Sequence, residues 1–303
     1  MKTDNISEKK NCEKIEASEM ILNSDGSIFH LHLLPEDLAE NIILVGDPGR
    51  VKLVGSLFDF IEVSKENREF HTITGKYNGK RISVISTGIG PDNIDIVLNE
   101  LDALVNIDLQ TGLIKEEKIA LNIVRIGTCG CVQADIPVGA YALSEKHIGC
   151  DGVLRFYKDI DNISDKDFEE AFIKQCNWTT NSARPYVIMP SKGLVNKLYS
   201  EGETYKGITI TAVGFYGPQG RMLRAPIMMP KINDSIANFK YKGYRIINYE
   251  MESAVVAGLS SILGHNAATI CLIIANRATG EAIANYYPNI KELIKYTLNK
   301  LLN

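Results

Sequence analysis

Ile247-Asn248-Tyr249-Glu250-Met251-Glu252-Ser253 places two carboxylates between apolar flanks. The aromatic-rich run Tyr241 to Ile247 precedes the acids and the apolar run Ala254 to Leu259 follows them, which predicts a strand followed by a helix. Carboxylates are costly to bury unless a partner satisfies them. A sugar diol is a suitable partner, because its hydroxyl groups donate to an acceptor-only carboxylate. The alternative is that Glu250 and Glu252 simply begin a helix, where negative charge favours the macrodipole.

Length and composition indicate a protein of the soluble globular class. The chain has 303 residues, of which 45% are hydrophobic and 23% are charged, so it can bury a sizeable core. A formal net charge of −4 argues against general nucleic-acid binding. No apolar run approaches the roughly 20 residues of a membrane helix, and residues 1–20 lack the apolar core of a signal peptide. We therefore expect a cytoplasmic protein that binds neither membranes nor nucleic acid.

The cysteines are scattered along the chain and are expected to be free thiols, as in a reducing cytoplasm. They are Cys12, Cys129, Cys131, Cys150, Cys176 and Cys271. Cys129 and Cys131 are separated by one residue, which is not zinc-finger spacing, and no histidine cluster accompanies them. We expect neither a metal site nor a bound cofactor.

Strands that alternate with helices predict one α/β domain over residues 21–303, with helices on both sides of a sheet. Residues 1–20 mix lysine with glutamate and are expected to form a charged, flexible N-terminal extension. Residues 151–185 are polar and irregular in pattern, which is typical of a surface insertion. Helices are expected beyond Pro91 and from Pro288. The expected strands are 41–45, 81–86, 122–126, 209–215 and 271–275.

Glycines and arginines gather near the expected strand ends. Gly46-Asp47-Pro48-Gly49-Arg50 reads as a tight turn, and Gly127-Thr128-Cys129-Gly130 follows the strand that carries Arg125, with Arg68 between the two stretches. Glycine lets backbone N–H groups approach an oxyanion, arginine supplies a planar fork of donors, and Thr128 adds a hydroxyl group. Together they suit a free phosphate ion. The nucleotide-binding signatures GxxxxGK[ST] and GxGxxG after a strand do not occur.

Any one of these arginines, taken singly, is expected at the surface, and any one of the glycines is expected in a turn. Arg125 is the exception, because it lies within an apolar strand and a buried guanidinium needs an anion.

A fourth stretch, Gly214-Phe215-Tyr216-Gly217-Pro218-Gln219-Gly220-Arg221, suits a planar heterocycle. Gln219 and Arg221 can present an amide and a guanidinium to one ring, with Phe215 available to stack on it. An amide both donates and accepts, which suits the lactam N–H and C=O edge of uracil. Alone, this stretch would be read as an ordinary polar loop. The four stretches together favour a free phosphate ion bound beside a ligand that carries a sugar and a base.

In these motifs the chain resembles the nucleoside phosphorylase family, and specifically its uridine phosphorylase branch. The resemblance runs from about Phe29 to the C-terminus and is interrupted by residues 151–185. It implies an α/β fold of three α/β/α layers around a central twisted, partly closed mixed sheet. The matching stretches are Phe29-His30-Leu31, Gly46-Asp47-Pro48-Gly49-Arg50, Arg68-Glu69-Phe70, Ser86-Thr87-Gly88-Ile89-Gly90, Arg125-Ile126-Gly127-Thr128, Gln219-x-Arg221, Asn248-Tyr249-Glu250-Met251-Glu252-Ser253 and Asn276-Arg277.

The resemblance also implies a role for each candidate residue. The phosphate-binding residues would be Gly46, Arg50, Arg125 and Thr128, with Arg68 supplied by a neighbouring subunit. The ribose-binding residues would be Met251 and Glu252, with Glu250 close by and His30 reaching the 5′-hydroxyl group from the neighbour. The base-binding residues would be Gln219 and Arg221 at the uracil edge, Phe215 on the ring and Arg277 on the far side.

The implied reaction is the reversible phosphorolysis of uridine to uracil and ribose 1-phosphate by a pentosyltransferase. Inorganic phosphate is the co-substrate and attacks the anomeric carbon itself. Gln219 and Arg221 would stabilise the leaving uracil anion, while phosphate and Glu252 would lie on the cationic sugar side. We expect a homo-oligomer with sites shared between subunits, either a dimer or a trimer of dimers.

Three alternatives stay open. A purine nucleoside phosphorylase is opposed by Ala275-Asn276-Arg277, because the purine branch carries Ser/Thr-Asp-His there and its acid protonates the base. A nucleosidase would not need Arg50, Arg68 and Arg125 together. A non-catalytic nucleoside-binding protein would not need both the phosphate set and the base set.

Some bacterial members of the family bind a monovalent cation at the dimer contact. In this chain Glu69 and Ile89 match the cation ligands of those members, but Asn93 stands in place of a serine ligand, which leaves cation binding open.

Overall fold

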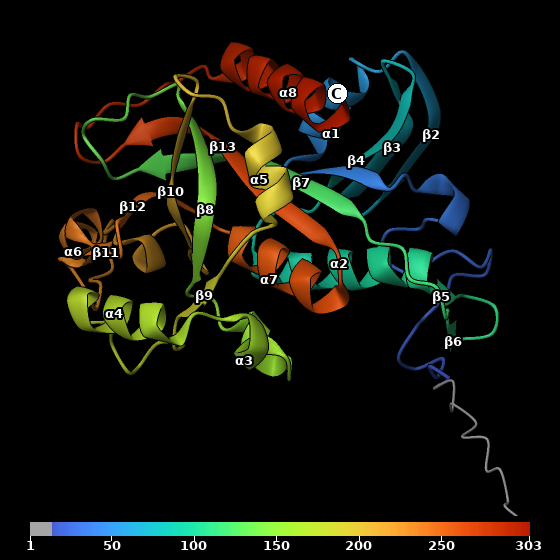
Figure 1. Ribbon diagram of the computed structural model, residues 1–303, viewed down its shortest axis with the longest axis horizontal. Coiled ribbons are helices and arrows are strands. Elements are labelled where there is room, and N and C mark those ends of the chain that lie inside the picture. The colour runs from blue at the N-terminus through green and yellow to red at the C-terminus, as the bar shows by residue number, and fades with distance from the viewer. Residues whose placement is uncertain (1–13) are drawn as a thin grey trace, which may run out of the picture.

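The computed structural model describes residues 14–303 and contains an eleven-stranded mixed sheet between helices (Figure 1). Its order is β11-β12-β10-β8-β13-β7-β1-β4-β3-β2, and β9 pairs with β8. The strands of this sheet are β1 Asn41–Val45, β2 Phe60–Asn67, β3 Phe70–Tyr77, β4 Lys80–Ser86, β7 Asn122–Cys131, β8 Tyr141–Gly149, β9 Tyr186–Ile188, β10 Thr204–Thr211, β11 Lys240–Tyr241, β12 Tyr244–Glu250 and β13 Asn266–Asn276. Strands β5 (Ile107–Asp108) and β6 (Leu113–Ile114) form a separate pair.

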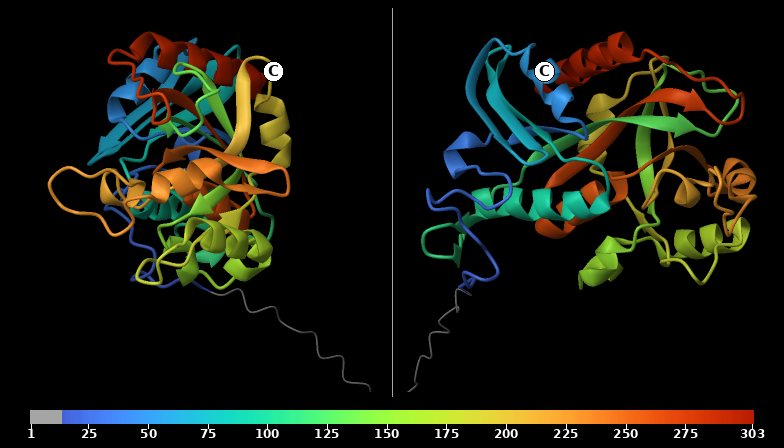
Figure 2. Two further views of the ribbon diagram at one scale, coloured as in Figure 1. Left: turned by 90° about the vertical axis from the view of Figure 1, so that its left-hand side faces the viewer. Right: turned by 180° about the vertical axis from the view of Figure 1, so that it is seen from behind.

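Helices cover both faces of the sheet. They are α1 Pro48–Gly55, α2 Pro91–Asn106, α3 Ile160–Ile163, α4 Lys166–Cys176, α5 Lys192–Leu198, α6 Ile232–Asn238, α7 Ser253–Leu263 and α8 Tyr287–Leu302. In Figure 1, α8 lies above the sheet and α2 and α7 lie below it, and Figure 2 shows this arrangement from two further sides. Leu98 and Val255 belong to the core under one face, while Val54, Leu198 and Leu293 belong to the core under the other. The three-layer α/β/α architecture is confirmed.

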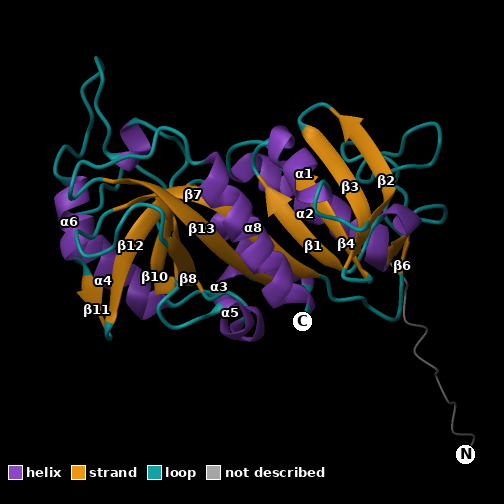
Figure 3. Ribbon diagram, turned by 90° about the horizontal axis from the view of Figure 1, so that it is seen from above, coloured by secondary structure: helices purple, strands orange, loops and turns teal. Residues whose placement is uncertain are grey.

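Strand β7 is central, and the sheet curls around its carboxyl end. It pairs in parallel with β1 on one side and with β13 on the other. Strand β12 then crosses it in the antiparallel direction, with Asn248 opposite Cys131 and Tyr249 opposite Gly130. Since β12 also pairs in parallel with β10, the sheet is partly closed, and Figure 3 shows its curvature with α8 crossing over it. The carboxyl ends of four strands thereby meet in one place.

Several element boundaries differ from the expected ones. Strand β7 does not end at Ile126, because β13 pairs with it as far as Cys131. The expected strand at 209–215 is Thr204–Thr211, so Phe215 lies outside the sheet. The expected final strand at 271–275 begins earlier, at Asn266.

The expected tight turn at residues 46–50 is shorter than predicted, because Pro48 already begins α1. The Asp47 side chain accepts a hydrogen bond of 2.8 Å from the N–H of Gly49 and caps the helix. Arg50 therefore lies in the first turn of a helix rather than in a loop.

The interpretation of residues 151–185 as an irregular surface insertion was wrong. The segment contains a short 3-10 helix (Val153–Phe156), α3 and α4. Phe168 and Phe172, four residues apart on α4, are fully buried. The ring centroid of Phe168 lies 5.0 Å from that of Tyr241 and 5.8 Å from that of Phe239. The segment thus supplies one side of the core beneath β10 and β12, and its polar composition hid the helical spacing of the two aromatics.

Part of the expected N-terminal extension contacts the body of the protein. Lys14 forms a β-bridge with Leu113, and the N–H of Ile15 donates to the carbonyl of Gly112 over 2.9 Å. Residues 1–13, with Cys12, lie outside the described residues.

The five cysteines of the described chain are buried free thiols, as expected. Within residues 14–303, no helix is long and apolar enough to cross a membrane, and no three His, Cys, Asp or Glu side chains are grouped to hold a metal ion.

Because α4 is part of the core, Phe168→Ala is expected to lower the free energy of unfolding by about 3–5 kcal/mol, the usual cost of removing a buried phenylalanine. Urea denaturation of both proteins measures it. Phe156→Ala is the matched control, because Phe156 lies in the same segment but is 92% exposed, and it should change stability by less than about 0.5 kcal/mol. Equal effects of the two substitutions would contradict this account.

Candidate active site

A cavity of about 740 Å³ lies where the strand ends meet. Its wall is formed by the ends of β1, β7, β12 and β13 and by the segments that follow β4 and β10. The structure brings together ten of the predicted site residues in this wall: Gly46, Arg50, Arg125, Thr128, Phe215, Gln219, Arg221, Glu250, Met251 and Glu252. Arginines and acids line one side of the cavity, and the amide of Gln219 and the ring of Phe215 line the other.

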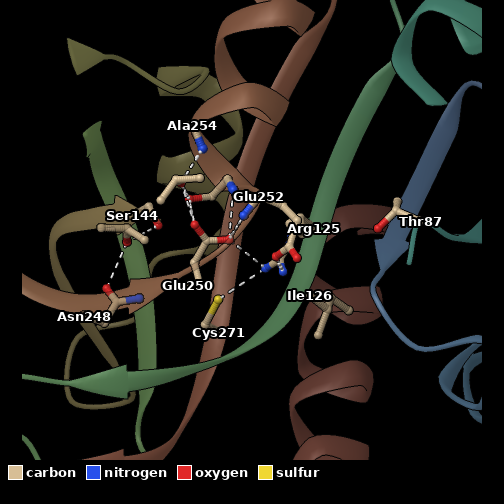
Figure 4. Close-up of polar contacts among 12 residues, drawn as sticks. Thr87, Arg125, Ile126, Ser144, Asn248, Glu250, Glu252, Ala254 and Cys271 are labelled. Atoms are coloured by element: carbon tan, nitrogen blue, oxygen red, sulfur yellow. Dashed lines mark hydrogen bonds and ion pairs between the residues drawn. The ribbon is translucent and has the colours of Figure 1, made fainter. Parts of the chain in front are cut away.

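Arg125 is buried between the two acids of the β12–α7 junction (Figure 4). Its Nη1 lies 3.3 Å from Oε2 of Glu250, and its Nη2 donates a hydrogen bond to Oε2 of Glu252. Nη1 also lies 3.7 Å from Sγ of Cys271 on the neighbouring strand. The expectation that a guanidinium in this strand needs an anion is met by the chain's own carboxylates.

The Glu250 carboxylate is held by four donors besides Arg125. The hydroxyl groups of Thr211 and Ser253 donate to its Oε1 over 2.6 and 2.7 Å. The backbone N–H groups of Glu252 and Ser253 donate to its Oε2, both over 2.8 Å. Glu252 is held more loosely, with the N–H of Gly90 donating to its Oε1 over 2.9 Å. Glu250 is therefore a fixed element of the site, and Glu252 faces the cavity with fewer constraints.

The two acids differ in how readily they ionise. Burial opposes the charge of Glu250, but Arg125 and the two hydroxyl groups outweigh it and hold the pKa of Glu250 below its ordinary value. Burial, reinforced by the neighbouring charge of Glu250, raises the pKa of Glu252 despite its contact with Arg125. Burial also disfavours the charge of Arg125, yet Glu252 and Glu250 together raise its pKa above the ordinary value. The guanidinium stays charged.

Arg50 lies on the same side of the cavity as Arg125. Its Nη1 donates to the carbonyl of Ile126 over 3.4 Å, which places the guanidinium beside the middle of β7, next to Arg125. Burial, together with the positive charge of Arg125, lowers the pKa of Arg50. Gly46 allows close packing there, since a Cβ atom on it would lie 3.3 Å from the carbonyl oxygen of Gly88. Two guanidinium groups that face one cavity form a strong site for an anion.

On the opposite side, Gln219 is buried and fixed by Arg277. Nη1 of Arg277 donates to the backbone carbonyl of Gln219, and Nη2 donates to its side-chain Oε1, both over 2.6 Å. Because arginine is only a donor, the amide oxygen must face Arg277, which leaves the amide NH₂ group free to donate toward the cavity. Arg277 itself does not line the cavity and lies over the ring of Tyr249, 4.5 Å from its centroid.

Arg221 and Phe215 form a stacked pair at the cavity wall. The guanidinium carbon lies 4.1 Å from the ring centroid of Phe215, which holds a planar cation beside a half-exposed ring. Burial lowers the pKa of Arg221, and burial together with the charge of Arg221 lowers that of Arg277 to about 10. Arg221 at the cavity wall and Arg277 behind Gln219 thus create positive potential around this amide, which suits a ligand that gains negative charge.

His30 and Arg68 lie outside the cavity wall. Nδ1 of His30 is 2.6 Å from a carboxylate oxygen of Glu100 on α2, and the guanidinium carbon of exposed Arg68 is 5.8 Å from the ring centroid of Phe29. Phe29 also packs edge-on against the ring of His30. The two residues therefore gather on one surface of the subunit, and the prediction that they complete a neighbour's site stays a prediction.

Asn276 does not face the cavity. Its Nδ2 donates to the carbonyls of Gln133 and Ile136, both over 2.8 Å, and its Oδ1 accepts from the N–H of Ala278 over 2.9 Å. An aspartate here would place a carboxylate against two carbonyl oxygens. Asn276 stands where the purine branch carries its acid, and its side chain thus forms the hydrogen bonds that close a turn.

Sequence reasoning missed several residues that hold the site together. Thr211, Ser253 and Gly90 supply donors to the two acids, and Cys271 contacts Arg125. Ser253 stands directly after the acids, and Thr211 closes an apolar strand whose partner is β12. Thr211 lies inside the expected strand 209–215 and is a strand end only in the folded chain, and nothing in the sequence pairs Gly90 with Glu252.

Removal of Arg125 leaves two buried carboxylates without their cation. Arg125→Ala is therefore expected to lower the free energy of unfolding by about 3–5 kcal/mol at neutral pH. In the variant, the folded state holds protons on these acids more tightly than the unfolded chain does. The loss of unfolding free energy caused by Arg125→Ala should therefore grow as the pH rises from 5 to 8.

Urea denaturation at the two pH values measures this deficit. Arg245→Ala is the control, because Arg245 makes a partly exposed double contact with Asp135 (2.9 and 2.7 Å), which is expected to contribute less than about 1 kcal/mol. A deficit of Arg125→Ala that is independent of pH would show that the acids do not depend on Arg125.

The chain is similar over most of its length to proteins of one superfamily. The family model "Phosphorylase superfamily" matches residues 40–298. A uridine phosphorylase of Thermococcus kodakarensis is 29% identical over 276 residues, which cover 89% of this chain and 84% of that protein. A DeoD-type purine nucleoside phosphorylase of Bacillus velezensis is 25% identical over 258 residues, which cover 83% and 89% of the two chains.

Among solved structures, that of the Trypanosoma brucei nucleoside phosphorylase, described as showing uridine phosphorylase activity, superimposes with a TM-score of 0.84 at 29% identity. The superposition covers 93% of this chain and 99% of that one. The match over residues 40–298, together with the fold and the arrangement of the cavity, shows that this chain belongs to the phosphorylase superfamily.

Proposed function

We propose that the protein is a uridine phosphorylase, which transfers the ribosyl group of uridine to inorganic phosphate and gives uracil and ribose 1-phosphate. The observation that carries the proposal is the division of one cavity into two ends. Arg50 and Arg125 lie at one end and Gln219 and Arg221 lie at the other, and the acids of the β12–α7 junction contact Arg125. Such a cavity accommodates phosphate, ribose and a base in a row.

Phosphate is bound between Arg50 and Arg125, with the hydroxyl group of Thr128 beside it. A guanidinium carries five N–H donors, so Arg125 can keep its contacts with Glu250 and Glu252 and still donate to a phosphate oxygen. Fixed donors of this kind hold the nucleophile on one face of the sugar and bring its oxygen close to the anomeric carbon. No side chain is required as a nucleophile, because phosphate itself attacks.

As the phosphate oxygen forms its bond to the anomeric carbon, the bond from that carbon to N1 of uracil breaks, and its electron pair leaves with the base. The ribose passes through a cationic, oxocarbenium-like state. Glu252 accepts hydrogen bonds from the ribose hydroxyl groups, with Met251 packed against the sugar, and its carboxylate and the phosphate stabilise the positive charge.

The leaving uracil carries negative charge that the base end of the cavity must accept. The NH₂ group of Gln219 and the guanidinium of Arg221 donate to the carbonyl oxygens of uracil, and Phe215 stacks on the ring. Arg277 acts from behind by fixing the Gln219 amide. Loss of one such preorganised donor typically costs ~3 kcal/mol, or ~10²-fold in rate.

Charge within one subunit supports a site that a second subunit completes. The positive charges of Arg50 and Arg125 are balanced by Glu250 and Glu252, so a bound phosphate adds uncompensated negative charge in a buried place. We propose that Arg68 of a neighbouring copy supplies further positive charge, that His30 of that copy meets the 5′-hydroxyl group, and that the enzyme is a cytoplasmic homo-oligomer. Phosphate is its co-substrate, and it requires no other cofactor.

Uracil release from uridine tests the reaction. We expect release that depends on phosphate, with uridine preferred strongly over inosine and cytidine, because a site built to hydrogen-bond one heterocycle edge rejects ligands that lack it by ~10⁴-fold. Release without phosphate would indicate a nucleosidase. Comparable kcat/KM for inosine and uridine would overturn the assignment of the base, and no reaction with any nucleoside would indicate a binding protein.

The same assay tests the base end of the cavity. Gln219→Ala should lower kcat/KM for uridine by ~10²-fold. It should also reduce the difference in kcat/KM between uridine and cytidine, because the amide that distinguishes the hydrogen-bonding edges of the two bases is gone. Gln175→Ala is the control, since Gln175 is an exposed glutamine on α4 and should behave like the unmodified protein.

The shared site predicts rescue between two inactive variants. Subunits that carry Arg68→Ala are expected to regain activity when they are mixed with subunits that carry Glu252→Ala, because some sites then receive both intact residues. Arg50→Ala mixed with Glu252→Ala is the control. Arg50 and Glu252 line the same cavity of one subunit, so this pair should show no rescue. If the first pair also stays inactive after mass measurement confirms subunit exchange, the site is not shared.

A further inference from the structure

A buried histidine lies behind the acids without lining the cavity. His147 is on β8, and its Nδ1 is 2.9 Å from Oγ of Ser253 at the start of α7. The ring is fully buried, and its Nε2 has no hydrogen-bond partner among residues 14–303. Three contacts therefore connect this ring to Arg125: His147 to Ser253, Ser253 to Oε1 of Glu250 over 2.7 Å, and Oε2 of Glu250 to Nη1 of Arg125 over 3.3 Å.

The direction of these hydrogen bonds follows from the chemistry of the groups. Ionised Glu250 can only accept, so Ser253 must give its single hydroxyl proton to that carboxylate. Nδ1 of His147 must then be the donor to Oγ of Ser253, which makes the neutral Nδ1–H tautomer the one that fits. Burial lowers the pKa of His147 to about 4, so the ring is neutral at neutral pH and has one N–H to give.

Stability does not explain a histidine at this position. A buried nitrogen without a partner is unfavourable by roughly as much as a hydrogen bond contributes, and Nε2 is such a nitrogen. A leucine is of similar size and would fill the place with no polar atom to satisfy. What a leucine cannot do is donate to Ser253, and this donor is the feature that distinguishes His147.

We propose that His147 is a positioning residue of the phosphorolysis reaction: through Ser253 it orients the Glu250 carboxylate, which in turn holds Arg125 at the phosphate end of the cavity. The inference deepens the proposed function and rests on it for the identity of the reaction. It assigns to His147 on β8 an effect on phosphate binding, although His147 contacts no substrate.

Four variants test the relay: His147→Leu, His147→Asn, Ser253→Ala and the double variant His147→Leu/Ser253→Ala. Each is assayed for kcat/KM with phosphate varied, for phosphate affinity by calorimetry, and for Tm. His147→Leu should lower kcat/KM for phosphate by about tenfold, the equivalent of one hydrogen bond, and weaken phosphate binding without lowering Tm. His147→Asn should recover most of the loss, because its amide N–H can take the place of Nδ1–H.

The double variant identifies the route of the effect. If His147 acts only through the Ser253 hydroxyl group, His147→Leu should cause no further loss once Ser253 is alanine. Additive losses would overturn the relay, and so would a His147→Leu variant with unchanged phosphate kinetics. A fall in Tm that parallels the loss of activity, without recovery in His147→Asn, would assign a merely structural role. If His147→Leu does not fold, His147→Gln replaces it, because its longer amide reaches toward Nε2 and should not restore the donor to Ser253.

The readouts separate this inference from the proposed function. A wild-type protein that binds phosphate but does not cleave uridine would refute the uridine reaction, and phosphate affinity in the same variants would still decide the role of His147. A wild-type protein that does not bind phosphate would overturn both.

Discussion

The guanidinium of Arg125, buried between Glu250 and Glu252, is the contact on which the rest of the site depends. None of these charges would be tolerated alone at this depth, and each is retained because the others neutralise it. The contact joins β7 to the junction of β12 and α7, two segments more than 120 residues apart in the chain. It also fixes the geometry of the cavity, because one of its members faces the anion end and another faces the sugar. Loss of any member would therefore affect both folding and chemistry.

This constraint explains the curvature of the sheet and the small residues in it. Strand β12 must cross the end of β7 for its acids to reach Arg125, and it does so opposite Gly130 and Cys131. Gly127 is required because the Arg125 side chain lies over it, with Nη1 only 2.1 Å from where a Cβ atom would be. Behind the junction, the hydroxyl groups of Thr211 and Ser253 donate to the Glu250 carboxylate, and the ring of His147 contacts Ser253. Rigid support on one side leaves Glu252 as the acid that can respond to a ligand.

Local patterns in the sequence predicted the features that depend on residues close together in the chain. The acids stand at a strand–helix junction, Arg125 stands in a buried strand, and the three-layer fold follows from the alternation of elements. Strand ends were predicted poorly, because β7 extends to Cys131 only when β13 lies beside it. The core role of α4 was missed because Phe168 and Phe172 are surrounded by charged residues. Contacts such as those of Arg277 with Gln219, 58 residues apart, depend on the folded chain and have no signature in the sequence.

The central claim is that Arg125 and Arg50 form the phosphate site while Arg125 remains paired with the two acids. A crystal structure of the protein with inorganic phosphate and uracil tests it most directly. The account predicts one phosphate within hydrogen-bond distance of both guanidinium groups and of the Thr128 hydroxyl group, with Glu250 still in contact with Arg125. Phosphate bound elsewhere, or an Arg125 that contacts only the acids while phosphate occupies the cavity, would contradict it.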